Sequence, residues 1–279
     1  MDSGRRWTRN DGGPGTTVDP EHPAAACCGR NWMTEGLPVP HNRRMTSTGP
    51  PGRRLTLIFD ADDTLWENNA LFERVVEDYL DWLAHPTMDR TELRSIVDDV
   101  EAANIADNGY GAKAFLRNLA ITFEKLSSRT ATAEEVRQIE NLAEALLRHD
   151  IELMPGVVEV LEQLRARHDL YLLTKGAPDE QRRKIDASGL ACYFSEIHVV
   201  PEKDEAVYRA LAVRHHLDRE VTWMIGNSPK SDILPARAAG LNAVFIPHRL
   251  TWVLERAEID HTDEKVLVLD SFSGLLDHF

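Results

Sequence analysis

The chain has 279 residues, a formal net charge of −14, 42% hydrophobic residues and 28% charged residues. This length suits one large domain, or a core domain with a smaller accessory domain. No run approaches the roughly 18 apolar residues that a membrane-spanning helix needs, so we expect no membrane partner. Because the charge is strongly negative and no basic face is evident, we also expect no nucleic-acid partner.

The cysteines are few and scattered. Cys27 and Cys28 are adjacent near the N-terminus, and Cys192 lies far downstream. This spacing fits neither a disulfide framework nor a zinc site. A reducing compartment is therefore the default, and we expect a cytoplasmic protein. The sequence carries no signal of the oligomeric state.

Residues 1–54 differ in composition from the rest of the chain. They are rich in Gly, Pro, Thr, Asn and Arg, and show neither helical nor strand periodicity. Such a segment buries too little apolar surface to offset the entropy of ordering, so we predict a disordered N-terminal tail. Met45 lies just before the ordered region, which leaves open a true start at that residue.

From residue 55 onward, short apolar runs alternate with amphipathic segments. The runs have the length of buried strands. They occur at 55–59, 170–173, 197–200, 221–225, 243–246 and 266–269. Helical periodicity marks segments such as 155–167 and 230–239, and Gly240 is well placed as a C-terminal cap. Strands alternating with helices predict an α/β fold, with a Rossmann-like parallel sheet covered on both faces.

Residues 67–150 interrupt this alternation between the first and second predicted strands. Their apolar residues follow helical periodicity, with a turn-rich break at 107–111. We therefore predict about four helices that form a small separate bundle. The core domain then comprises residues 55–66 and 151–279. Residues 66–69, where the chain leaves the core, are expected either to line a pocket or to form a hinge.

Polar and charged side chains follow four of the predicted strands. In an open parallel sheet, ligands bind beyond the carboxyl ends of the strands. The groups in question are Asp60-Ala61-Asp62-Asp63-Thr64, Thr174-Lys175-Gly176, Lys203, and Gly226-Asn227-Ser228-Pro229-Lys230-Ser231-Asp232. We expect these carboxylates, hydroxyls and lysines to converge on one edge of the sheet.

Together these residues resemble the four motifs of the haloacid dehalogenase-like (HAD) superfamily, from residue 55 to about residue 250. The first motif of that family is Asp-x-Asp-x-Thr after a strand, and this chain carries Asp60-x-Asp62-x-Thr64. The helical insert resembles the family's helical cap, which follows the first motif. The resemblance implies a magnesium-dependent phosphatase that acts on a small phosphorylated metabolite.

The resemblance also implies catalytic roles. Asp60 would be the nucleophile that forms an aspartyl-phosphate. Asp62 would protonate the leaving alkoxide and later deprotonate the attacking water. Lys203 would neutralise the charge that develops during transfer. Asp63 points away from Asp62 if strand geometry continues, so we interpret it as a structural, capping residue.

The implied metal ligands are oxygen atoms, as Mg²⁺ prefers. They are the Asp60 carboxylate, the backbone carbonyl of Asp62, and Asp232 or Asn227. Many family members have Gly-Asp where this chain has Gly226-Asn227. Because an amide oxygen contributes no charge, Asp232 would carry more of the metal binding, and direct ligation by Asn227 stays open.

Four residues are predicted to bind the substrate. Thr174 and the backbone amides after it, including that of Gly176, would hold phosphate oxygens by resemblance to the family. Lys175 either touches the substrate or is a solvated lysine at a strand end. Tyr110, flanked by glycines in the helical insert, is expected to contact the leaving group, as loops of this kind do in helical-cap relatives. The alternative for Tyr110 is a simple turn between helices.

Two alternative functions stay open. Hydrolytic dehalogenases of the superfamily use the same aspartate nucleophile, but they need neither an acid two residues later nor magnesium. The presence of Asp62 and Asp232 therefore favours a phosphatase. A non-catalytic HAD-like binding module would lack the nucleophile or the general acid, and this chain has both. Nucleotides, sugar phosphates and phosphoglycolate all remain candidate substrates.

Overall fold

The computed structural model describes residues 53–144, 146 and 151–279. Apart from its last two residues, the predicted disordered tail lies outside the described residues, and so does Met45. The two described tail residues, Arg53 and Arg54, form ion pairs with Asp218 and Asp169. No helix in these ranges has both the length and the apolar character that crossing a bilayer requires.

The described residues contain a six-stranded parallel sheet with the order β3-β2-β1-β4-β5-β6. The six predicted strands are confirmed, with small shifts at their ends. They are β1 (Thr56–Phe59), β2 (Asp169–Lys175), β3 (Glu196–Val200), β4 (Thr222–Gly226), β5 (Asn242–Phe245) and β6 (Val266–Val268). Since β1 lies between β2 and β4, the residue that follows Phe59 emerges at the centre of the carboxyl edge.

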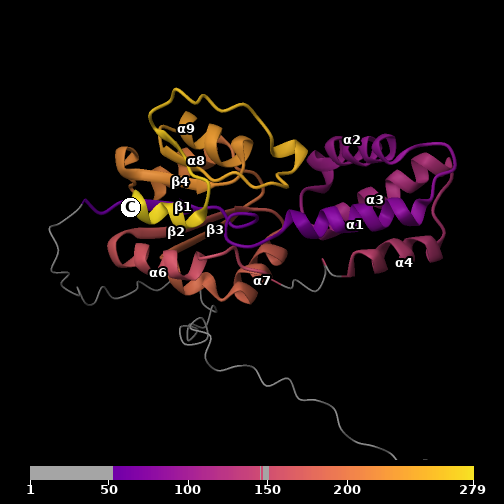
Figure 1. Cartoon of the computed structure of the whole chain (residues 1–279), viewed down its shortest axis with the longest axis horizontal. Helices are drawn as coiled ribbons and strands as arrows, with labels where there is room; N and C mark the ends of the chain where they lie inside the picture. The colour runs from indigo at the N-terminus through magenta and orange to yellow at the C-terminus, as the bar shows by residue number, and fades with distance from the viewer. Residues whose placement is uncertain (1–52, 145, 147–150) are drawn as a thin grey trace, which may run out of the picture.

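Helices cover both faces of the sheet, as Figure 1 shows. One face carries α6 (Val157–Arg167) and α7 (Pro178–Ser188), and the other carries α8 (Glu205–Arg214) and α9 (Leu234–Ala238). Successive side chains of β1 pack against the helices on opposite faces of the sheet, because strand side chains alternate between faces. Leu57 and Phe59 pack in the cluster that contains α6, whereas Ile58 packs with Tyr208 of α8. The fold is therefore the predicted α/β sandwich.

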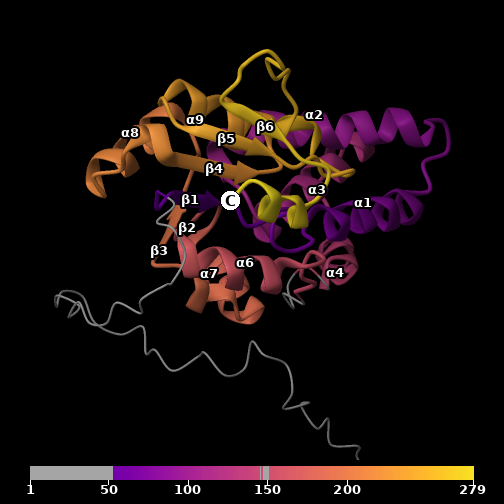
Figure 2. The same cartoon turned by 60° about the vertical axis from the view of Figure 1, so that its left-hand side comes forward.

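Four helices follow β1 and lie together beyond the carboxyl ends of the strands (Figures 1 and 2). They are α1 (Asn69–Leu83), α2 (Arg90–Asn108), α3 (Ala112–Ser127) and α4 (Ala133–Leu142). Their buried side chains form an apolar cluster distinct from the two clusters that flank the sheet. The predicted break at 107–111 is confirmed between α2 and α3. The division into a cap of residues 67–150 and a core of residues 55–66 and 151–279 stays a prediction.

Local sequence explains where these helices begin. The side chain of Asp89 accepts the Glu92 amide at 2.9 Å, and Glu92 accepts the Asp89 amide at 3.0 Å, which closes a capping box at α2. Thr132 and Glu135 form the same motif at α4. Short 3-10 helices complete the described chain at Leu190–Tyr193, Arg219–Val221, Val253–Glu255 and Phe272–Asp277.

The predicted helix at 230–239 differs from the structure in one respect. The chain first forms a π-helical turn at Pro229–Ile233 and only then α9. Both the Asp232 amide, at 2.9 Å, and the Ile233 amide, at 3.2 Å, donate to the carbonyl oxygen of Ser228. The Ser228–Ile233 bond spans five residues, and this wide turn carries the Asp232 side chain to the carboxyl edge of the sheet.

The α6 layer provides a test of the core. Leu161 is fully buried between α6 and the sheet. Leu161→Ala should lower the free energy of unfolding by about 2–5 kcal/mol, because it removes buried methyl groups and leaves a cavity. The matched control is Val213→Ala, at a side chain that is 68% exposed, where a change within about 0.5 kcal/mol is expected. Urea denaturation measures both, and equal effects would contradict this packing.

Candidate active site

Asp60 lies at the centre of the carboxyl edge, directly after β1. Its amide donates to the carbonyl oxygen of Ile225 at 2.9 Å, so the β1–β4 ladder continues into the motif. The side chain is buried. The hydroxyl of Thr64 donates to its Oδ2 at 3.1 Å, and the ammonium of Lys203 donates to its Oδ1. Thr64 of the first motif and Lys203, from after β3, therefore each hold one oxygen of the Asp60 carboxylate.

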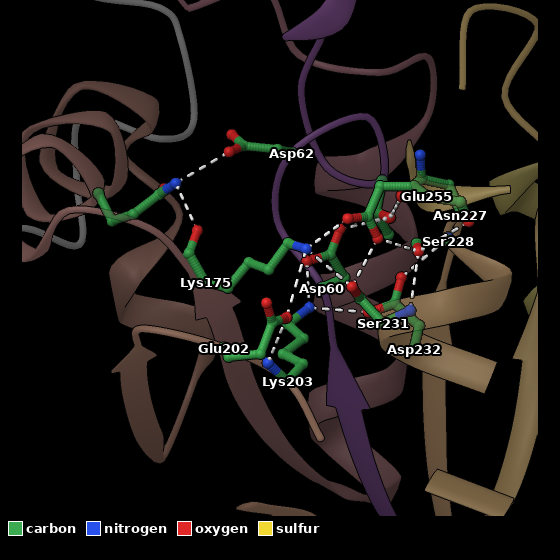
Figure 3. Close-up of polar contacts among 12 residues, drawn as sticks. Asp60, Asp62, Lys175, Glu202, Lys203, Asn227, Ser228, Ser231, Asp232 and Glu255 are labelled. Carbon is green, nitrogen blue, oxygen red and sulfur yellow. Dashed lines mark hydrogen bonds and ion pairs between the residues drawn. The ribbon is translucent and has the colours of Figure 1, made fainter. Parts of the chain in front are cut away.

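Lys203 also joins Asp60 to Asp232, which comes from the π-helical turn. Its Nζ lies 2.8 Å from Oδ1 of Asp232, and both side chains are almost fully buried. Figure 3 shows the three side chains converging from separate segments. The structure thus brings together Asp60, Lys203 and Asp232 as the sequence predicted.

Gly226 makes room for Asp232 at the end of β4. A Cβ atom at position 226 would lie 2.2 Å from Oδ2 of Asp232, well inside van der Waals contact. The same Oδ2 accepts the backbone amide of Ser228 at 2.9 Å. Glycine is therefore required because another side chain occupies the space that a Cβ would need.

One ammonium faces two buried carboxylates in this cluster. Burial alone would lower the pKa of Lys203, but Asp232 and Asp60 outweigh it and raise that pKa, so Lys203 stays charged. Burial raises the pKa of Asp60 to about 7, although Lys203 opposes the shift. The cluster consequently carries more negative than positive charge when both carboxylates are ionised.

The donor set fits a hard divalent cation. Carboxylate oxygens of Asp60 and Asp232 both accept from the Lys203 ammonium. The single Thr64 proton is shared between Asp60 Oδ2 and the side-chain oxygen of Asn227, at 3.1 and 3.3 Å from the hydroxyl oxygen. Oxygen donors with excess negative charge are what Mg²⁺ prefers, and a buried Asn227 supplies a neutral oxygen. The predicted contribution of the Asp62 carbonyl stays a prediction.

Asp62 is held apart from this cluster. Trp66 donates to its Oδ1 at 2.7 Å, Gln181 to its Oδ2 at 2.9 Å, and Lys184 lies 3.0 Å from each oxygen. Figure 3 shows its carboxylate set apart from Asp60 and hydrogen-bonded to a separate ammonium. Burial alone would raise the pKa of Asp62, but these three donors outweigh it and hold the pKa below its usual range.

The residues that lead out of the core belong partly to the pocket and partly to the connection with α1. Asp63 accepts the amides of Asn68 at 2.8 Å and of Asn69 at 2.9 Å, so it caps α1 as predicted. Asn68 and Asn69 border the cavity, and Asn68 accepts a hydrogen bond from Lys184 at 2.7 Å. Asn68 and Asn69 therefore line the pocket, and the hinge stays a prediction.

The second motif reaches the cavity through its first two residues. Thr174 is buried at the cavity wall. Lys175 is only 15% exposed and contacts Glu255 and Ser231, so it is not a solvated lysine. The amide of Gly176 instead donates to Val200 at 3.0 Å and belongs to the sheet ladder. Gly176 itself therefore offers no free amide to a phosphate.

Tyr110 reaches from the α2–α3 connection to the strand ends. Its hydroxyl donates to Glu202 at 2.5 Å, and the Lys175 ammonium lies 4.2 Å from its ring centroid. Its ring also meets Trp252 edge-on at 6.2 Å. The loop therefore contacts the core, and the contact of Tyr110 with the leaving group stays a prediction. Tyr110 borders the same cavity as Asp60, and this cavity has a volume of about 160 Å³.

Several residues of the site were not found from the sequence. Gln181 and Lys184 lie on α7, which starts just after the second motif. Their positions in the first two turns of that helix were the available signal. Gly176 leaves the space that Gln181 occupies, since a Cβ at position 176 would lie 2.8 Å from the side-chain amide nitrogen of Gln181. Glu255 accepts hydrogen bonds from Ser228 and Ser231, both at 2.5 Å, but it ends a 3-10 helix of three residues that has no local signature in the sequence.

The profile of the haloacid dehalogenase-like hydrolase family matches residues 55–240. The chain belongs to this family. It is therefore a hydrolase, built on the fold that its sequence predicted.

Individual relatives agree with this assignment. A phosphoserine phosphatase from Thermus thermophilus is 32% identical over 135 residues, which are 46% of this chain and 53% of that protein. The match thus spans about half the length of that relative. A haloacid dehalogenase-like hydrolase structure from Xanthomonas campestris has a TM-score of 0.69 and 28% identity, covering 81% of this chain and 90% of its own.

The structure of the putative HAD-hydrolase YfnB from Bacillus subtilis, which is bound to magnesium, has a TM-score of 0.58 and 18% identity. It covers 81% of this chain and 99% of its own. At this identity the similarity shows the fold alone.

The crowding at Gly226 gives a test of the site. Gly226→Ala should lower the free energy of unfolding by about 1–3 kcal/mol, because the new methyl group overlaps Asp232. Displacing Asp232 should also reduce hydrolase activity by about 100-fold. The control is Gly274→Ala, since a Cβ there would meet no atom closer than 3.8 Å. Chemical denaturation and steady-state kinetics measure both variants, and wild-type activity in Gly226→Ala would refute the crowding.

Proposed function

We propose that this hydrolase is a magnesium-dependent phosphatase that cleaves a small phosphate monoester through an aspartyl-phosphate intermediate. The observation that carries the proposal is the arrangement around Asp60. This buried carboxylate shares Lys203 with Asp232, and a second carboxylate, Asp62, borders the same cavity. A nucleophile, a charge-neutralising cation and a proton-transfer group are thereby available to one substrate.

In the first step, a carboxylate oxygen of Asp60 attacks the phosphorus atom and the bond to the leaving oxygen breaks. Asp62 donates a proton to that oxygen, so an alcohol departs and Asp60 carries the phosphoryl group. Lys203 offsets the negative charge that gathers on the phosphoryl oxygens. Thr174, at the cavity wall, offers a hydroxyl to one of these oxygens.

In the second step, water attacks the phosphorus atom of the aspartyl-phosphate. Asp62 removes a proton from this water, and breaking the acyl-phosphate bond restores the Asp60 carboxylate and releases inorganic phosphate. The donors Trp66, Gln181 and Lys184 stabilise Asp62 as a carboxylate, which suits the base role. For the acid role, Asp62 has to leave Lys184 and approach the leaving oxygen.

Asp60, Asp232 and Asn227 are the residues that would hold Mg²⁺, together with the carbonyl of Asp62. The ion would supply positive charge that reduces repulsion between the Asp60 carboxylate and the phosphate. Support comes from the oxygen-only donor set and from the magnesium bound to the YfnB structure. The two carboxylates of Asp60 and Asp232 also share a single ammonium, and the excess negative charge favours binding of a cation.

The substrate is proposed to be a small phosphorylated metabolite, in line with the phosphoserine phosphatase among the relatives. Tyr110 and Lys175 border the cavity and form the side of it that would meet the leaving group. A dehalogenase has less support, because a halide leaves without a proton and would have no use for Asp62. A non-catalytic binding module has less support because Asp60 is intact.

Metal dependence is the first test of the proposal. Hydrolysis of para-nitrophenyl phosphate should require Mg²⁺ and fall to background in excess EDTA, because only Lys203 would then balance Asp60 and Asp232. Adding Mg²⁺ back should restore the rate. Release of nitrophenol measured with and without EDTA decides this. Full activity in EDTA would contradict the metal site and revive the dehalogenase alternative.

The roles of the two motif carboxylates can be separated by leaving group. Asp60→Asn should abolish turnover. Asp62→Asn should slow an alkyl phosphate by about 100- to 10,000-fold, and an aryl phosphate much less, because a good leaving group needs the proton less. Rates for para-nitrophenyl phosphate and for an alkyl phosphate measure this difference. If Asp62→Asn is as fast as wild type on the alkyl phosphate, Asp62 is not the general acid.

A further inference from the structure

The walls that α1, α2 and α3 contribute to the cavity combine apolar and polar side chains. Their apolar side chains are Phe72, Val76, Ile105, Ala114 and Phe115. Their polar side chains are Asn69, Glu73, Arg94, Glu101 and Asn118. Glu101 is the carboxylate among them that is about nine-tenths buried. A carboxylate in such a setting is costly unless a partner compensates for it.

Glu101 has a hydrogen-bond donor in the indole of Trp252 but no basic residue devoted to it. The nearest guanidinium, Arg94, is engaged elsewhere. It binds the two oxygens of Glu73 at 2.5 and 2.8 Å and also donates to Asp98 at 2.9 Å. With Arg94 already shared by two carboxylates, Glu101 adds to an excess of negative charge at this wall. Burial is the main reason that the pKa of Glu101 rises to about 7.

The other basic groups around the cavity are also engaged. Carboxylates outnumber lysines and arginines among the described residues that line it. Each of the three lysines that line it contacts a carboxylate: Lys203 with Asp60 and Asp232, Lys184 with Asp62, and Lys175 with Glu255. Within the described part of the chain, the lining thus leaves no basic side chain for a second anionic group on the substrate.

We propose that Glu101 is the residue that recognises the leaving group, and that it selects a hydrogen-bond donor, above all an ammonium group. The substrate class is then a phosphate monoester of a largely apolar alcohol that bears an amine and lacks a carboxylate. This inference rests on the proposed phosphatase function, because it places the phosphate at Asp60 and the rest of the molecule against α1–α3.

The physical reason lies in the low dielectric of the buried wall. An ammonium beside Glu101 forms a charge-assisted hydrogen bond and supplies the missing positive charge. A carboxylate at the same place would face Glu101 with no free cation to offset the repulsion. Discrimination between an ammonium and a carboxylate substrate is strong, because the carboxylate substrate leaves the buried charge of Glu101 unpaired.

A matched series of aryl phosphates tests the proposal. The substrates are phenyl phosphate, 4-(aminomethyl)phenyl phosphate and 4-carboxyphenyl phosphate, which differ only at the end remote from phosphorus. With Mg²⁺ at pH 7.5 or thereabouts, we expect wild-type kcat/KM for the amine to exceed that for the carboxylate by about tenfold or more. In Glu101→Gln this ratio should fall close to one.

The control is Asp107→Asn, which makes the same carboxylate-to-amide change on the exposed side of α2 and outside the cavity lining. It should keep the wild-type ratio. A wild-type enzyme that uses the carboxylate as well as the amine overturns the inference, and so does Glu101→Gln with an unchanged ratio. Hydrolysis of phenyl phosphate separates the two proposals: if it occurs, only the Glu101 inference fails, and if it does not, the phosphatase function fails with it.

Discussion

The ammonium of Lys203 is the contact on which the rest of the site depends. It lies between Asp60, which follows β1, and Asp232, which comes from the π-helical turn after β4. These segments are far apart in the chain, and the parallel order of the sheet brings their ends to one edge. Two buried carboxylates would repel each other without this cation, so one lysine both assembles the site and sets its charge.

Close backbone approach is the second constraint. Gly226 leaves space for the Asp232 carboxylate, and Gly176 leaves space for Gln181, which donates to Asp62. Each glycine therefore serves a neighbouring side chain rather than a ligand directly. A side chain at position 226 would displace the Asp232 carboxylate, and one at position 176 would displace the Gln181 amide that donates to Asp62.

The helices after β1 connect to the catalytic edge through a small number of polar contacts. Glu180 of α7 accepts the Ala112 amide at the start of α3, at 3.0 and 3.2 Å from its two oxygens. Glu180 also lies 3.9 Å from Lys184, which holds Asp62. The start of α3 is thereby linked through Glu180 and Lys184 to the proposed proton-transfer residue. Since Tyr110 lies two residues before α3, this chain of contacts connects the Tyr110 loop to the position of Asp62.

The sequence by itself determined the sheet, the helical insert and the residues that gather around Asp60. Those features have local signatures: apolar runs of strand length, helical periodicity, and short polar motifs directly after strands. The position of Lys203 followed from the same rule, because parallel strands end at a common edge.

Only the tertiary structure decided which side chains serve those motifs. Glu255 reaches Lys175 from a 3-10 helix of only three residues, and Arg94 pairs with Glu73 of another helix, so neither contact has a pattern in the chain. The same holds for Gly176, whose amide belongs to the sheet and not to a phosphate site. Hydrogen bonds and charge pairs depend on distances of a few ångströms between residues remote in sequence, and those distances exist only after the helices pack on the sheet.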